Sequence, residues 1–250
     1  MRTEPAESAP LPALLRGDGP ARRLAIPLLE AIAGIAHGFT VIGSEPGHAL
    51  REAAGRDRPL VTLKQVHGRV VHVVSRAEPE NGPLVGDALL TERPGLAIAV
   101  HVADCVPILL CDPARGIVGA VHAGWRGTVA GVLPAAIAAA RALGSRPEDL
   151  RVALGPAIGP CCFVVGPEVA EAWRRADPEA ERSLRQDGDI RMDLTEGNRL
   201  QARRLGVPES QIAAAGLCTA CRPDLLESYR RSRGAGGRMT AFIVSGPVAR

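Results

Sequence analysis

Hydrophobic residues along the chain gather in runs that predict buried strands. Continuous apolar runs rich in branched side chains occupy residues 96–110 and 117–122, and both are typical of strands covered on their two faces. A shorter run predicts a strand at 151–154, and two late runs predict strands at 212–217 and 239–245. No repeat and no Ser/Gly-rich linker divides the chain.

Helical patterns alternate with these runs. Residues 128–143 are rich in Ala and Leu and end at Gly144, which predicts a helix that Pro134 should kink or shorten. Three later segments are assigned in the same way: helices at 167–175 and 198–205, and a surface connection at 177–189. The mixture predicts a mixed α/β (α+β) fold, a sandwich of mixed sheets.

Length and composition limit the domain organisation and the partners. The chain has 250 residues, of which 46% are hydrophobic, enough for one large core. We therefore expect a single domain over residues 21–250, preceded by a loose, proline-containing N-terminus over 1–20. Because aromatic residues make up only 2% and the net charge is +3, a nucleic-acid partner is not expected.

The sequence also indicates a compartment. The first 20 residues mix charges with prolines and contain no apolar segment typical of a signal peptide, and no run is long enough for a membrane span. Six cysteines without a secretory leader fit a reducing environment. We expect a soluble cytoplasmic protein without a membrane partner, either a monomer or a weak homo-oligomer.

Three separate segments each offer one metal ligand at the end of an element. They are His67 in the sequence KQVHG, Cys105 in ADC, and His122 in HAGWRG. Two nitrogens and one sulfur suit zinc, and three protein ligands leave a fourth tetrahedral position for water or substrate, as in catalytic zinc sites. Copper is a less favoured alternative. The metal would make these three residues catalytic.

Ordinary structural roles are the alternative explanation for the same residues. A lone His or Cys in an apolar strand is more often a core residue, and separations of 38 and 17 residues do not establish that the three converge. Asp104, beside Cys105, is a candidate acceptor for a ligand histidine or a general base, and it equally suits the cap of a turn. Trp125 and Arg126 are expected in a turn bounded by glycines.

Several polar residues near these segments are candidate substrate contacts. Arginine favours oxyanions such as phosphate through its planar pair of donors, and an amide or carboxylate can bond a base or sugar. The candidates are Lys64, Gln65, Asp87, Arg126 and Arg230, with Arg231 as an alternative to Arg230. A surface position is the ordinary explanation for any single arginine, and turn capping is the ordinary one for Asp87.

Four other cysteines form two short pairs. Cys161 and Cys162 are adjacent, and Cys218 and Cys221 form one Cys-X-X-Cys. A single Cys-X-X-Cys is a weak signal for zinc or redox chemistry, so we interpret all four as ordinary thiols.

Seven motifs occur in an order that resembles the multicopper polyphenol oxidase (laccase-domain) family, also called the YfiH-like or peptidoglycan editing factor family. The matching segments are LKQVHG, GDALLT, ADCVPILL, VHAGWRG, GPAIGPCCFVVG, the later Asp193-Leu194 with Asn198, and CTAC followed by SYRR. The resemblance runs from about residue 60 to the C-terminus, and residues 41–62 depart from the family pattern. It implies an α-β-β-α sandwich of the CNF1/YfiH-like kind, with zinc on His67, Cys105 and His122.

The resemblance also implies activities. The family is associated with phosphorolysis of adenosine, inosine and methylthioadenosine, with adenosine deamination, with copper-dependent phenol oxidation, and with editing of peptidoglycan precursors. True multicopper oxidases hold their coppers with roughly ten histidines, many in His-X-His pairs. This chain has six histidines and no such pair, so laccase chemistry is not expected.

The favoured hypothesis is a zinc-dependent enzyme that acts on a purine nucleoside with phosphate. The alternatives are an amide hydrolase acting on muramyl peptide precursors, and a zinc-binding interaction protein without catalysis.

Overall fold

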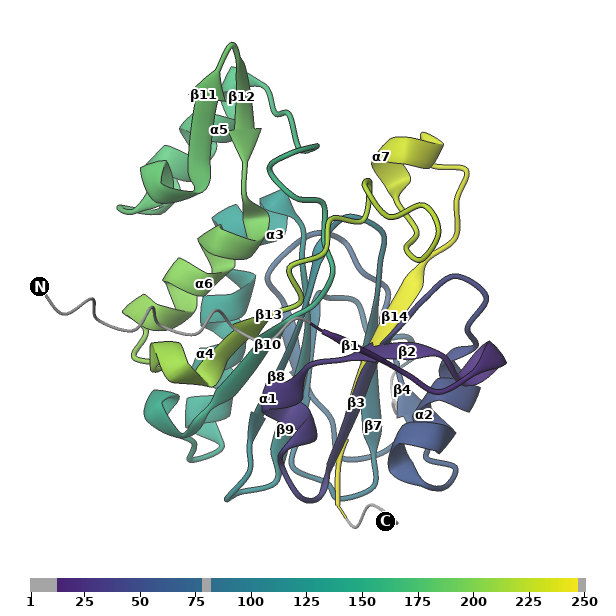
Figure 1. Cartoon of the computed structure of the whole chain (residues 1–250). Helices are drawn as coiled ribbons and strands as arrows, with labels where there is room; N and C mark the ends of the chain where they lie inside the picture. The colour runs from purple at the N-terminus through teal and green to yellow at the C-terminus, as the bar shows by residue number, and fades with distance from the viewer. Residues whose placement is uncertain (1–12, 78–81, 247–250) are drawn as a thin grey trace, which may run out of the picture.

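Two six-stranded mixed sheets form the centre of the fold in this computed structural model, which describes residues 13–77 and 82–246 (Figure 1). The first sheet has the order β1 (Leu14–Arg16), β2 (Arg23–Ala25), β3 (Ile35–Thr40), β14 (Met239–Ser245), β7 (Ala97–Val102), β4 (Leu60–Val61). The second has the order β13 (Ile212–Ala214), β10 (Arg151–Leu154), β8 (Val106–Asp112), β9 (Ile117–Ala123), β6 (Ala88–Thr91), β5 (Val71–Val73). A separate hairpin joins β11 (Leu184–Asp187) to β12 (Asp189–Met192).

Helices cover the outer faces of both sheets. The α-helices are α1 (Pro27–Glu30), α2 (Pro46–Ala54), α3 (Trp125–Ala130), α4 (Val132–Ala142), α5 (Pro167–Ala176), α6 (Leu194–Arg204) and α7 (Tyr229–Ser232). Short 3-10 turns lie at η1 (Gly19–Ala21), η2 (Pro147–Asp149), η3 (Ala180–Ser183) and η4 (Glu209–Gln211). Helices α4 and α6 lie over the second sheet and α2 over the first, which gives the expected α-β-β-α layers (Figure 1).

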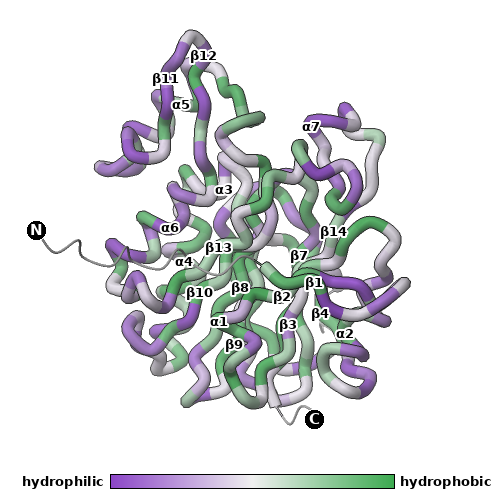
Figure 2. Tube along the Cα trace, viewed as in Figure 1, coloured by the Kyte–Doolittle hydropathy of each residue, from purple (hydrophilic) through white to green (hydrophobic). Residues whose placement is uncertain are grey.

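Burial on both faces explains why the strands are apolar throughout rather than alternating. In β8, Ile108 points into the core under the helices and Leu109 into the core between the sheets. In β14, Ile243 faces the other sheet and Phe242 faces α2. Hydrophobic positions therefore concentrate in the central strands, while the β11–β12 hairpin is largely hydrophilic (Figure 2).

The predicted strand at 96–110 is wrong in one respect, since it contains two strands in different sheets. Strand β7 belongs to the first sheet and β8 to the second, and the chain changes sheets over residues 103–105. An apolar pattern cannot reveal this break, because both strands are fully covered.

Other expected boundaries also shift. Trp125 and Arg126 begin helix α3 instead of a turn, and the predicted helix at 128–143 is split at Gly131, whose φ of 81° ends α3. Pro134 fits the first turn of α4 and causes no kink, because the first turn of a helix needs no intrahelical N–H donors. The connection expected at 177–189 contains η3 and most of the β11–β12 hairpin.

The structure also changes the bounds of the helix predicted at 198–205 and of the loose segment predicted at the N-terminus. Helix α6 starts four residues earlier, after Asp193, whose carboxylate accepts the Glu196 N–H at 2.9 Å. Within the expected loose segment, Leu14–Arg16 form β1 against β2, while residues 1–12 lie outside the described part of the chain. The single domain over 21–250 stays a prediction. None of the described helices is long and apolar enough to cross a bilayer.

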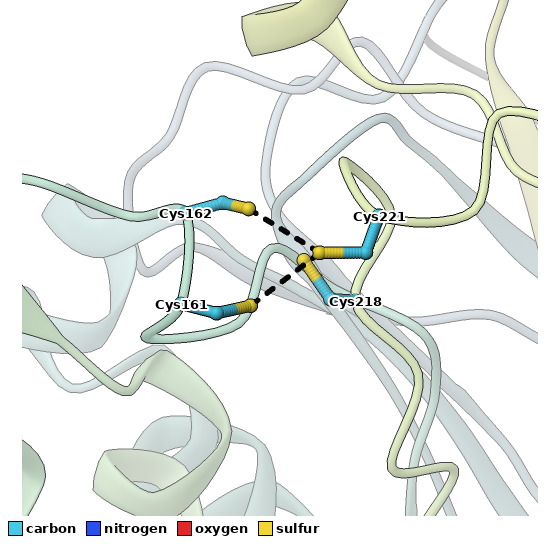
Figure 3. A group of neighbouring side chains, drawn as sticks. All are labelled: Cys161, Cys162, Cys218 and Cys221. Atoms are coloured by element: carbon cyan, nitrogen blue, oxygen red, sulfur yellow. Dashed lines mark hydrogen bonds between the residues drawn. The ribbon is translucent and has the colours of Figure 1, made fainter.

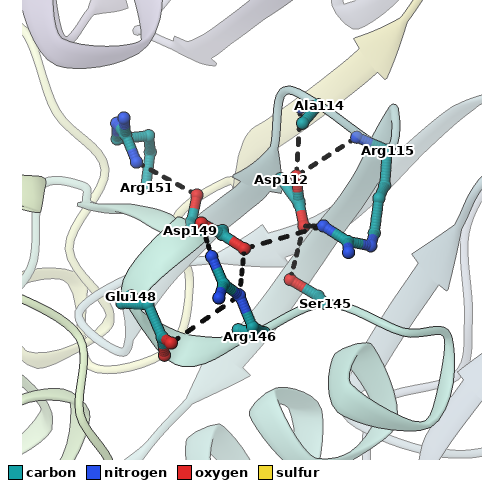
Figure 4. Close-up of polar contacts among 8 residues, drawn as sticks. All are labelled: Asp112, Ala114, Arg115, Ser145, Arg146, Glu148, Asp149 and Arg151. Atoms are coloured by element: carbon teal, nitrogen blue, oxygen red, sulfur yellow. Dashed lines mark hydrogen bonds and ion pairs between the residues drawn. The ribbon is translucent and has the colours of Figure 1, made fainter.

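A buried carboxylate closes the end of the β8–β9 hairpin far along the strand from the candidate ligands. Asp112 is fully buried and accepts the backbone N–H groups of Ala114 and Arg115 and, at 2.7 Å, the Ser145 hydroxyl (Figure 4). Arg115 also pairs with it at 3.2 Å. Its lone pairs are satisfied, which is the condition for burying a charge in a sheet.

A buried histidine in the first sheet makes the stability of the fold depend on pH. His37 on β3 is 3% exposed, and its Nε2 accepts the Ile26 N–H at 2.9 Å. Burial, with a smaller contribution from the Arg23 charge, lowers the pKa of His37 to about 4. An acceptor role requires the neutral ring, so protonation both breaks this bond and buries a charge.

Acid should therefore destabilise the fold through His37. The unfolded chain takes up this proton at about pH 6.5 and the folded chain only at about pH 4, so stability falls as the pH drops through that window, by up to about 3 kcal/mol. In His37→Gln the amide oxygen can still accept the Ile26 N–H but does not titrate. Urea unfolding of both metal-free proteins at several pH values should show a smaller acid loss in the variant, and equal losses would contradict this assignment.

Candidate metal centre

Two of the three predicted ligands lie where the chain passes from one sheet to the other. His67 lies between β4 of the first sheet and β5 of the second, and Cys105 lies between β7 and β8. His122 is on β9, directly opposite Pro107 of β8 in the register. These crossings bring segments that are distant in sequence to one end of the sandwich.

The three ligand groups converge. One ligand atom from each of His67, Cys105 and His122 lies within 4.8 Å of the others. The two imidazoles meet edge to face, with ring centroids 4.8 Å apart and planes at 78°. Their exposure is graded, since His122 is buried, Cys105 is half-buried and His67 is exposed. The trio is therefore open on the His67 side.

Asp87 positions two of these predicted ligands through hydrogen bonds to its carboxylate. It is fully buried just before β6, and its carboxylate accepts the backbone N–H of His67 at 2.9 Å and of Gly68 at 2.7 Å. The same carboxylate lies 2.8 Å from Nδ1 of His122. Burial alone would raise the pKa of Asp87, but the bonds from His122 and the two amides lower it, so the carboxylate is ionised.

An ionised acceptor fixes the tautomer of His122. Because a carboxylate accepts only, Nδ1 carries the hydrogen, and Nε2 is directed toward the other two ligands. This carboxylate–imidazole arrangement is typical of metal-binding histidines. Asp87, and not Asp104, is thus the acceptor behind a ligand histidine.

Electrostatics favour a thiolate in the metal-free site. Burial would raise the pKa of Cys105, but hydrogen bonds from His122 and His67 outweigh it and lower that pKa to about 7. For His122, burial lowers the pKa, while Asp87 and Cys105 raise it to about 9. The lowered pKa of Cys105 makes a negative sulfur accessible near neutral pH, beside a histidine that would give up its proton to a cation.

Two backbone conformations next to the ligands are unusual. His67 has φ of 60° and Asp104 has φ of 84°, in the left-handed region that L-residues rarely occupy. The Asp87 bonds hold His67 in this conformation. Asp104 is held by the Thr219 hydroxyl at 2.5 Å and the Arg230 backbone N–H at 2.6 Å, so its carboxylate is already engaged.

Gly124 lets the three ligands approach. A Cβ at this position would lie 2.9 Å from the Cys105 sulfur and 3.0 Å from Cδ2 of His67. The glycine that follows β9 is therefore required by space and not by its φ, which is −74°.

The trio lies in a cleft of about 670 Å³. Helices α3 and α7 both contribute side chains to its lining. The two helices lie at the same end of the sandwich (Figure 1). Its lining includes the three ligands together with Gln65, His101, Asp104, Trp125, Arg126, Phe163, Tyr229, Arg230 and Arg238. This size suits a small-molecule substrate.

The predicted substrate residues divide into two groups. Arg126 is exposed in the cleft, with its guanidinium 4.3 Å from the Trp125 ring centroid, and Arg230 lies on the other side, 5.4 Å from the ring centroid of Phe163. Gln65 also lines the cleft, but its amide exchanges two 2.7 Å bonds with the His101 backbone.

The second group lies away from the open cleft. Lys64 is exposed, and its backbone forms a parallel bridge with Val85, shortly before β6. It is not one of the described residues that line the cleft. Asp87 is buried under the ligands. Arg231, the alternative to Arg230, bonds the carbonyls of Thr219 and Leu226 at 2.6 Å each and serves the local loop.

Sequence reasoning missed two features. Arg238, whose guanidinium lies over Tyr229 at 5.5 Å, adds a third arginine to the cleft, and no motif marks it. The four cysteines interpreted as ordinary thiols also come together, with all their sulfurs within 4.8 Å of one another (Figure 3). The pairing of two short motifs, neither informative alone, is the signal that could have found this cluster.

The donor set fits a zinc ion. Two imidazole nitrogens and a thiolate are borderline-soft ligands, and their mutual separations allow one ion to reach all three. The open side leaves room for a fourth ligand from solution.

Comparisons with known proteins agree with this architecture. A family model described as multi-copper polyphenol oxidoreductase laccase matches residues 45–246. Purine nucleoside phosphorylase YlmD of Geobacillus stearothermophilus is 40% identical over 195 residues, 73% of this chain and 71% of that protein. Purine nucleoside phosphorylase YfiH of Escherichia coli is 39% identical over 184 residues, 73% of this chain and 72% of that protein.

Solved structures extend the likeness across the N-terminal third. The crystal structure of YlmD from Geobacillus stearothermophilus covers 94% of this chain and 99% of its own, with a TM-score of 0.83 and 32% identity. That of Bacillus licheniformis hypothetical protein YfiH covers 93% and 99%, with a TM-score of 0.81 and 31% identity. With the family model spanning most of its length and such relatives beside it, the chain belongs to the multi-copper polyphenol oxidoreductase laccase family.

Proposed function

We propose that this protein is a zinc-dependent purine nucleoside phosphorylase, in which His67, Cys105 and His122 hold the metal. The observation that carries the proposal is a three-donor site, open on one side, in a cleft that also presents arginines. The names of the relatives at about 40% identity support the same reaction. The substrates are a purine nucleoside and phosphate, and the expected compartment is the cytoplasm.

Phosphorolysis makes two demands on the cleft. A phosphate oxygen forms a bond to the anomeric carbon of the sugar while the bond from that carbon to the purine nitrogen breaks, and the purine leaves with the electron pair and takes up a proton. The cleft must therefore hold an anion beside the sugar and give the purine a flat surface. Arginine guanidinium groups meet the first demand, and Phe163 and Trp125 offer ring surfaces for the second.

The arginines are arranged to receive an oxyanion. Arg126 and Arg238 each lie over an aromatic ring, which orients the guanidinium, and Nη1 of Arg238 also donates to the Gly237 carbonyl at 2.9 Å. Arg230 is steadied by the Val164 carbonyl at 3.3 Å. In this proposal Arg126 is the principal phosphate contact because it lies in the first turn of α3, four residues after His122.

The metal has a separate role. When bound, zinc would supply a Lewis acid that polarises an oxygen in the open position. Asp87 positions His122 and His67, and Asp104 positions the loop that carries Cys105. Of the other predicted substrate residues, Gln65 positions His101 through its side-chain amide and Lys64 pairs its backbone with Val85, so both have a structural role in this proposal. Adenosine deamination would need the same open position, and it is the accompanying activity to assay.

The direct test is phosphate-dependent release of hypoxanthine from inosine and of adenine from adenosine, with metal content measured on the same sample. Cys105→Ala should lose bound zinc at this site and at least about a hundredfold in kcat/KM, because one of three ligands is gone. Cys111→Ala is the matched control, since this buried thiol lies in the core between the sheets. It should keep metal and turnover.

Failure would have a clear meaning. A zinc-loaded wild type that turns over neither nucleoside, with or without phosphate, would overturn the proposal. The muramyl peptide precursor is then the next substrate to assay, and zinc binding without turnover on it would favour an interaction protein.

Asp87→Asn should weaken zinc binding by roughly tenfold to a hundredfold, because the amide no longer fixes the His122 tautomer or accepts all its donors. Zinc affinity is measured by competition with a chromophoric chelator. Asp112→Asn removes an equally buried carboxylate from the other end of β8 and should lower stability without changing zinc affinity. Equal zinc affinities in wild type and Asp87→Asn would refute this positioning role.

Arg126→Gln should raise the KM for phosphate by roughly tenfold or more, as expected for losing a charge-assisted hydrogen bond. The KM for inosine should change less, and bound zinc should stay the same. Arg141→Gln, an exposed arginine in the last turn of α4, is the control. Steady-state kinetics with phosphate varied separates the cases, and an unchanged KM for phosphate would assign the anion to another residue.

A further inference from the structure

Two turns that are distant in sequence lie side by side outside the cleft. Cys161 and Cys162 follow the loop after β10, and Cys218 and Cys221 lie in the turn after β13. Ala157 and Cys218 form a parallel bridge, and the Thr219 N–H donates to the Ala157 carbonyl at 3.0 Å. The backbone thus places the two cysteine pairs against each other, and the four sulfurs point toward a common centre (Figure 3).

The sulfur separations suit a single tetrahedral ion. The Cys221 sulfur lies 3.6 Å from that of Cys161 and 3.4 Å from that of Cys162, and all four lie within 4.8 Å. With zinc–sulfur bonds of about 2.3 Å, the edge of a tetrahedron of sulfurs is about 3.8 Å. Clusters with several irons spread their thiolates more widely, so the spacing favours one ion. The six cysteines are free thiols, so none of the four is consumed by a disulfide.

The surroundings prepare the sulfurs for a cation. The Gly159 N–H donates to the Cys218 sulfur at 3.2 Å, a common support for a metal thiolate. A Cβ on Gly159 would lie 3.3 Å from the Cys161 sulfur, so this close approach favours glycine. The two turns thus hold the four sulfurs close together around one point, with a backbone donor directed at one of them.

We infer that Cys161, Cys162, Cys218 and Cys221 form a second metal site, a closed tetrathiolate centre for one zinc ion. Four protein ligands leave no open position, so its role is structural. This inference does not depend on the proposed nucleoside chemistry.

The site would fix one wall of the cleft. Cys162 directly precedes Phe163, which lines the cleft, and Thr219, between the other two cysteines, bonds Asp104 next to the ligand Cys105. Arg191 and Arg231 hold the carbonyls of Cys161 and Thr219 at 2.7 and 2.6 Å. An ion bound here would link two loops that are otherwise joined by few backbone hydrogen bonds.

Metal counting on reduced full-length protein tests the inference. Wild type should hold about two zinc ions per chain, and both Cys105→Ala and a quadruple variant with all four cysteines changed to Ser should hold about one. Cys105→Ala keeps every ligand of the tetrathiolate site, so the test does not depend on the quadruple variant folding. Failure of the nucleoside assay would leave this count unchanged.

Cobalt gives a second measurement. Metal-free Cys105→Ala loaded with Co²⁺ alone should show thiolate-to-cobalt charge-transfer absorption and the visible bands of tetrahedral cobalt, both absent from the quadruple variant. Its thermal unfolding midpoint should also fall when the metal is removed. A Cys105→Ala protein that retains no zinc and shows no such spectrum overturns the inference, as does a thiol count showing these four cysteines paired as disulfides.

Discussion

The buried carboxylate of Asp87 is the interaction on which the site depends. A desolvated charge is tolerated only when its lone pairs are filled, and here the donors are the backbone amides of Val66, His67 and Gly68 and the His122 imidazole. Those same donors belong to the loop of His67 and to His122. The requirement to satisfy one anion therefore fixes two ligands at once, including a backbone conformation at His67 that would otherwise be unfavourable.

Much of the fold could be predicted from the sequence, because covered strands leave long branched runs and helices leave Ala-rich ones. The change of sheet within 96–110 could not be, since it depends on a left-handed Asp104 held by Thr219, more than a hundred residues away. Helix α3 was missed because it starts at Trp125 directly after Gly124 and lasts six residues, too short to show a period.

The same division holds for the site. His67, Cys105 and His122 could be selected by ligand chemistry at element ends, and the structure brings them together. The roles of Asp87 and Asp104 could not be separated, because two aspartates in turns look alike until their donors are known. The cysteine pairs were uninformative for the same reason: a four-ligand set split across two turns exists only after β10 and β13 align in parallel.

The position of the three predicted ligands would let a bound ion hold the two sheets together. His67 and Cys105 each lie on a passage of the chain between the sheets, whereas His122 belongs to the second sheet alone. An ion bound by all three residues would link the two sheets at one end of the sandwich and resist any sliding of one sheet over the other. Its binding free energy would then add to the cohesion of the layers, so one atom would serve both the reaction and the cooperativity of unfolding.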